Sequence, residues 1–133
     1  MSDTDEAVDP ESFVSLLDAI RDILLRHDYL AQATLVADLI DLAHLESSDF
    51  ARKLGYGGIW GSAGSVADVV GLRPSLDPVD AETRQDSLEL QHLLIRLADQ
   101  MKAQGISSKG SEFVADAFRR GLERQRSRGD PRA

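Results

Sequence analysis

Apolar residues recur at helical spacing over most of this chain, and this pattern predicts an all-α fold. Between residues 13 and 24 they follow the i, i+3, i+4, i+7 rule of a single helix face, and a second set covers residues 35–43. Asp9-Pro10 marks the start of the first helix, because Asp is a favoured N-cap and Pro is favoured at the first helical position. The break at His27-Asp28 is so short that we expect the two helices to form an antiparallel hairpin. We expect the His27 ring to hydrogen-bond the last carbonyls of the first helix.

Two further long helices are predicted in the second half of the chain. One opens at Asp77-Pro78 and ends near residue 104, and the other covers about residues 112–125. One short helix is expected after a cap at Ser47-Ser48-Asp49 and carries Phe50 and Leu54. Another is expected at 66–70, on the other side of a glycine-rich loop. Runs with the period-two alternation of strands are missing. The predicted fold is therefore a compact bundle of four main helices, with one or two short helices around the loop.

The length of 133 residues fits one domain. We expect a disordered acidic tail at 1–8, a single helical domain at 9–126 and a second disordered tail at 127–133. The start is acidic, unlike a secretory signal, and no stretch approaches the roughly 20 apolar residues of a membrane span. We therefore expect a cytoplasmic protein without a membrane partner. The lack of cysteine excludes disulfides and thiolate metal sites.

The charge is unevenly distributed along the chain. Residues 1–50 hold 12 acidic and two basic residues, whereas the last fifteen hold six arginines and two acidic residues. We favour attraction between these two ends within the fold over separate partners. A chain with a net charge of −8 is poorly suited to neutralise the phosphates of a nucleic acid, so nucleic acid is not an expected partner. Four aspartates on the outer helix faces are predicted to steer a basic protein partner: Asp18, Asp22, Asp38 and Asp41.

Residues 55–64 contain five of the ten glycines and the only tryptophan. One interpretation is structural: glycines permit close backbone approach and positive φ, while Trp60 fills the core. Four residues would build that loop and the cap of the next helix: Gly61, Gly64, Ser65 and Asp68. In a second interpretation, Tyr56 and Trp60 are partly exposed anchors for a protein partner. A phosphate site is a third, although the Lys of a Walker A loop is missing.

The segment Trp60-Gly61-Ser62-Ala63-Gly64-Ser65-Val66-Ala67-Asp68 follows the helical hairpin and resembles one found in small bacterial helical proteins of unassigned function. Those proteins carry a Trp-Gly-Gly-x-Gly-Ser-hydrophobic-x-Asp stretch, and here Ser62 replaces the second glycine of the pair. The resemblance covers roughly residues 13–72. It implies a shared local structure, and the suspected roles of some members imply an immunity-like protein or an accessory partner of a toxin system. It brings no catalytic residues.

The histidines do not predict a metal centre. Asp41-x-x-His44 and Glu89-x-x-His92 have the carboxylate–histidine spacing of di-iron bundles. Stepping 100° per residue, however, places both pairs away from the apolar stripes, as solvated surface residues. A Gly-x-Ser-x-Gly nucleophile elbow is missing as well. We therefore expect no metal, no cofactor, no catalytic residues and no enzymatic activity.

The sequence predicts a non-catalytic, acidic protein-binding module, with an immunity-like or accessory role as its concrete form. Two alternatives stay open. One is a homodimeric structural protein, in which Leu88 and Ile95 form a second apolar stripe that one domain leaves uncovered. The other is a small ligand- or phosphate-binding protein that uses the Gly55–Ser65 loop.

Overall fold

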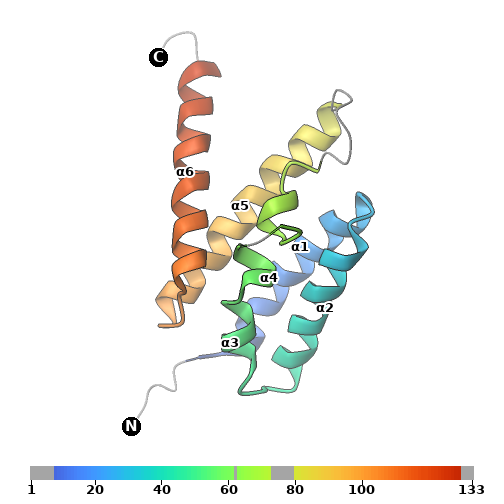
Figure 1. The fold of residues 1–133 in the computed structure, drawn as a ribbon, viewed down its shortest axis with the longest axis vertical. Coiled ribbons are helices and arrows are strands. Elements are labelled where there is room, and N and C mark those ends of the chain that lie inside the picture. The colour runs from blue at the N-terminus through green and yellow to red at the C-terminus, as the bar shows by residue number, and fades with distance from the viewer. Residues whose placement is uncertain (1–7, 62, 73–79, 130–133) are drawn as a thin grey trace.

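The computed structural model describes residues 8–61, 63–72 and 80–129, and the regular secondary structure of this part of the chain consists of helices, without strands. The all-α prediction is therefore confirmed. In chain order the elements are the 3₁₀ turn η1 (Pro10–Phe13), α1 (Val14–Arg26), α2 (Leu30–His44), α3 (Phe50–Leu54), α4 (Gly57–Trp60), the 3₁₀ turn η2 (Ala67–Val69), α5 (Ala81–Ala103) and α6 (Lys109–Gly129) (Figure 1).

The predicted hairpin of α1 and α2 forms one side of the molecule, and α5 packs against α1 (Figure 1). The chain reverses at Asp28, whose φ of 65° lies in the left-handed region that Asp tolerates better than most residues. The periodic apolar residues face inward as predicted, and the rings of Phe13 and Phe50 meet at 5.5 Å. The largest fully buried side chains are Phe13, Leu17, Ile20, Ile23, Leu24, Phe50, Leu54, Ile59, Leu90, Leu94, Leu97 and Met101.

Side chains near the end of α5 hold the start of the first helix. The Asp9 backbone N–H donates to Gln104 Oε1 (2.7 Å), and Gln104 Nε2 donates to Ser12 Oγ (2.8 Å). Gln100 Nε2 donates to the Ser12 carbonyl (2.9 Å). Asp9 is the N-cap residue, as expected, but its side chain makes no capping bond and its carbonyl accepts from Ser12 instead.

The two C-terminal helices begin at other residues than the sequence predicts. The Asp77-Pro78 start lies outside the described residues, and α5 begins at Ala81. Asp80 caps it by accepting the Thr83 backbone N–H at 2.7 Å, and this hydrogen bond is the main reason why the pKa of Asp80 is lowered.

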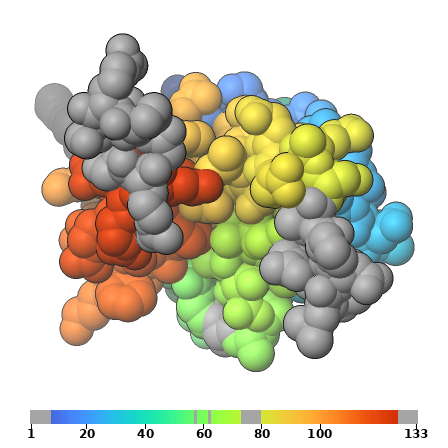
Figure 2. All heavy atoms as spheres, turned by 90° about the horizontal axis from the view of Figure 1, so that it is seen from above, coloured from blue at the N-terminus to red at the C-terminus, as the bar shows by residue number. Residues whose placement is uncertain are grey.

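Helix α6 is longer than predicted at both ends. Ser108 and Ser111 each accept a hydrogen bond from the other's backbone N–H, at 3.0 and 2.9 Å. This reciprocal cap starts the helix at Lys109, before the predicted start near residue 112. The helix continues to Gly129, so residues 127–129 of the predicted tail are helical. The rest of both predicted tails, except Val8, lies outside the described residues. Figure 2 shows α6 on one side of the molecule and the turn of the α1–α2 hairpin on the other.

Candidate functional site

Trp60 is a core residue. Its side chain is only 3% exposed, and its indole Nε1–H donates to the Leu54 carbonyl at 2.9 Å. The prediction that Trp60 is a surface anchor is therefore wrong, and the alternative, that it fills the core, is confirmed. The bond to Leu54 explains the burial, because an indole N–H needs a partner once water is removed.

The glycine-rich segment is partly helical, since residues 57–60 form the single turn α4 instead of a continuous loop. Gly64 has a φ of +84°, which favours glycine, whereas Gly61 is exposed with open space at its Cβ position. The predicted cap is present in part. The Asp68 N–H donates to Ser65 Oγ (3.1 Å), but Asp68 Oδ2 accepts the Gly64 N–H (2.9 Å) instead of that of Ser65. Asp68 therefore places a negative charge where a phosphate would need donors. The helix expected at 66–70 is the shorter 3₁₀ turn η2, whose N-cap is Val66.

A groove of about 710 Å³ runs along α2 and is closed on its other side by α3 and α4. Its α2 wall spans residues 31–42, which is about three helical turns. Most of its floor is apolar, and charged side chains lie along both rims. The lining residues are Ala31, Thr34, Leu35, Asp38, Leu39, Asp41, Leu42, Arg52, Lys53, Tyr56 and Gly58.

The two rims of this groove carry charges of opposite sign. On the α3 side, Arg52 is paired with Asp49 at 2.9 Å, and this contact lowers the pKa of the Asp49 carboxyl. Lys53 on the same side is exposed and has no ion pair among the described residues. On the α2 side, the exposed carboxylates of Asp38 and Asp41 have no partner among the described residues. The α2 rim therefore carries negative charge that the described part of the chain leaves uncompensated.

Tyr56 lines the same groove as these carboxylates, is the one aromatic residue among its described lining residues, and is 66% exposed. The structure thus brings together three of the residues predicted to contact a partner: Tyr56, Asp38 and Asp41. A tyrosine ring offers contact area and a hydroxyl at low conformational cost, and such residues are common at the centre of interfaces.

The other two predicted aspartates lie elsewhere. Asp18 is ion-paired with Arg21 on α1 itself. Asp22 lines a separate cavity of about 310 Å³ between α1 and α5. The predicted acidic front is therefore divided between two faces of the hairpin.

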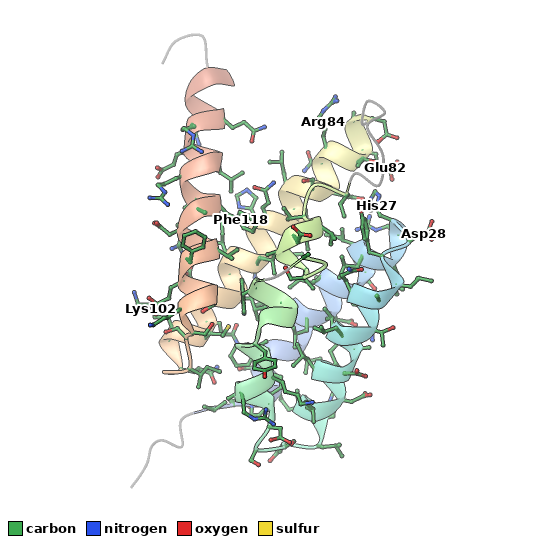
Figure 3. The ribbon with its side chains drawn as sticks, viewed as in Figure 1. His27, Asp28, Glu82, Arg84, Lys102 and Phe118 are labelled. Carbon is green, nitrogen blue, oxygen red and sulfur yellow. The ribbon has the colours of Figure 1, made fainter. Side chains whose placement is uncertain are left out.

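Sequence reasoning missed the partner of His27. The His27 ring contacts Asp86 of α5, with 2.9 Å between Nε2 and Oδ2, instead of the carbonyls of α1. Arg26 lies 3.6 Å from the same carboxylate. Figure 3 shows His27 at the hairpin turn, beside the first half of α5. The sequence feature that could have indicated this contact is Asp86 itself, which lies four residues before Leu90 and therefore on the buried stripe of α5. This part-buried pair connects the hairpin turn to α5.

The predicted apolar stripe of α5 is largely covered within the chain. Ile95 is 9% exposed and Leu88 is half-buried, so the expectation of an uncovered stripe is wrong. His92 is exposed, and His44 pairs on the surface with Glu11 at 2.9 Å.

The expected attraction between the two chain ends is not seen as an ion pair among the described residues, and residues 1–7 and 130–133 lie outside them. Arg119 pairs with Asp99 of α5, and Arg120 pairs with Asp116 of its own helix. Within the described residues, the ion pairs of α6 are therefore made with α5 and within α6 itself, and none is made with α1 or α2.

No family model, curated protein or solved structure matches this chain. Among the residues that the structure describes, no helix is both long and apolar enough to cross a membrane. The described histidine and carboxylate side chains form no group of three that could hold a metal ion.

Proposed function

We propose that this chain is a protein-binding module whose contact surface is the groove between α2 and the α3–α4 segment. The observation that supports it is the combination of an apolar floor, the uncompensated Asp38 and Asp41, and the exposed Tyr56. Apolar area supplies the driving force for association, and the carboxylates select for a basic partner and speed its approach. The length of the α2 wall suits an amphipathic helix laid into the groove, with its apolar face inward and basic residues toward α2. An immunity-like role, in which the groove masks a basic surface, is one concrete form of this proposal.

A site-specific photo-crosslinker tests this surface. The photoreactive side chain replaces Tyr56 in the groove or, as a control, Phe113, which is 72% exposed outside it. In native lysate we expect discrete adducts from position 56 and none of the same mass from position 113. Equal adducts from both positions would show that the groove is not the contact surface.

Charge reversal distinguishes the groove from the general acidity of the hairpin. We expect Asp38→Lys with Asp41→Lys to remove the position-56 adducts, because the partner then meets like charges. Asp18→Lys with Asp22→Lys makes the same change in net charge outside the groove and should leave the adducts in place. If both pairs act alike, long-range charge alone accounts for binding.

A further inference from the structure

The outer half of α6 extends beyond the packed part of the molecule (Figure 1). The last buried residue of α6 is Ala115, and Phe118 is the last one packed against the core. Residues 119–126, called the basic arm below, are exposed apart from the half-buried Gly121 and Leu122.

Half of the arginines in the basic arm are unpaired. Arg119 and Arg120 take part in the ion pairs described above, whereas Arg124 and Arg126 are exposed without a partner in the described part of the chain. Their guanidinium groups stand on a stiff helix and point into solvent, where carboxylates of another molecule can reach them.

The basic arm cannot reach the groove of its own chain. In Figure 1 the free end of α6 lies at the top of the molecule, while α3 and the end of α2 lie at the bottom. The helix would have to leave α5 and α4, against which its first half packs. Contact between the arm and the groove therefore requires two copies.

The chemistry of the groove matches an arginine-rich helix. Asp38 and Asp41 provide carboxylates for guanidinium groups, and the face of the Tyr56 ring can receive a cation. The apolar floor suits Leu122 and the methylene stems of arginine, which cover apolar surface while the charged ends stay in water. An anionic polymer is the weaker candidate for the arm, because the chain as a whole carries a net charge of −8.

We propose that the groove of one copy binds the basic arm of a second copy, head to tail. This inference rests on the proposed function, since it takes the groove to be a protein-binding surface, and it names the occupant. Because the two surfaces differ, two copies form a reciprocal dimer where each arm can reach the groove of the other. Otherwise successive copies form a ring if the rotation closes and a longer chain if it does not. A contact between solvent-exposed charges is screened by salt, so association should be strongest at low ionic strength.

A charge-exchange experiment tests the proposal, with self-association measured by sedimentation velocity at low and high ionic strength. The arm variant is Arg124→Glu with Arg126→Glu, the groove variant is Asp38→Arg with Asp41→Arg, and the exchanged variant combines all four. All four side chains are exposed, and circular dichroism checks that each variant is folded. We expect the wild type to associate at low salt, each double variant to weaken this by about tenfold or more, and the exchanged variant to regain it. An equimolar mixture of the two double variants should form mixed assemblies.

A wild type that stays monomeric at low salt and high concentration would overturn the proposal. So would an exchanged variant that fails to recover. The arm substitutions make the chain more acidic and the groove substitutions make it less acidic, so general repulsion cannot weaken both double variants and cannot explain a rescue. The crosslinking experiment separates this failure from failure of the proposed function. Adducts of position 56 with another protein, from a chain that is monomeric alone, would retain the groove as a binding surface and reject the second copy as its occupant.

Discussion

Two glycines of the same helix should respond in opposite ways to alanine. Gly110 lies in the first turn of α6, where a Cβ would stand 3.0 Å from the Cβ of Trp60. Trp60 is held in place by its hydrogen bond to Leu54, so it has little freedom to withdraw. Gly121, eleven residues later, has nothing within 4 Å of the same position. Gly121→Ala is therefore the matched control for Gly110→Ala.

The expected magnitudes follow from these surroundings. Alanine in place of glycine inside a helix adds roughly 0.5–1 kcal/mol to the free energy of unfolding, and Gly121→Ala should show this gain. At Gly110 the gain is offset by overpacking against a buried side chain, which costs about 1–3 kcal/mol. We expect Gly110→Ala to be the less stable variant by about 2 kcal/mol, which corresponds to a Tm difference of about 6–10 °C for a chain of this size.

Urea unfolding followed by fluorescence measures this difference directly, because Trp60 is the only tryptophan and lies at the contact. The two variants should share one m-value and differ in midpoint. If Gly110→Ala is as stable as Gly121→Ala, the close packing of α4 against the start of α6 is not a constraint, and the buried position of Trp60 needs another explanation.

Three further predictions concern the core and its hydrogen bonds. The fluorescence of Trp60 should have a blue-shifted maximum and resist acrylamide quenching; a red, readily quenched emission would contradict its burial. Asp86→Ala should lower the free energy of unfolding by about 1–3 kcal/mol, because His27 loses its buried partner, whereas Asp22→Ala on the neighbouring surface should change urea stability little. Asp80→Ala should destabilise α5 at neutral pH. Since the pKa of Asp80 is lowered in the folded state, its stabilisation is present above the pKa of the unfolded chain and is lost as pH falls through the folded value. The difference in stability between Asp80→Ala and wild type should therefore shrink in acid. Urea midpoints measured across pH test this, and a difference that stays constant would contradict it.

Features set by neighbouring residues could be predicted from the sequence. The hairpin of α1 and α2 follows from apolar periodicity and a short break, and the Ser65–Asp68 cap follows from residue types three positions apart. The outward positions of Asp38 and Asp41 follow from the same periodicity. Each of these features depends on interactions between residues a few positions apart, so the spacing of residue types in the sequence is enough to predict it.

Features set by residues far apart in the chain could not be predicted. The glycine-rich segment forms a helical turn because Trp60 is drawn into the core between Leu54 and Gly110, and glycine content alone indicates a loop. The partner of His27 lies 59 residues away. The groove exists because α3 and α4 pack beside α2. The sequence could therefore name Tyr56 as a candidate, but it could not show that Tyr56 lines the same groove as Asp38 and Asp41.

The hydrogen bonds between the end of α5 and residues 9–12 have a consequence for biosynthesis. Gln100 and Gln104 bind residues that the ribosome releases some ninety positions earlier. The α1–α2 hairpin can form as soon as it emerges, but its apolar side facing α5 stays open to water until most of the chain has been translated. During that interval the nascent protein exposes a surface of the kind that chaperones recognise. A stop codon placed before Ala81, the first residue of α5, should therefore yield a fragment that aggregates instead of a smaller folded domain.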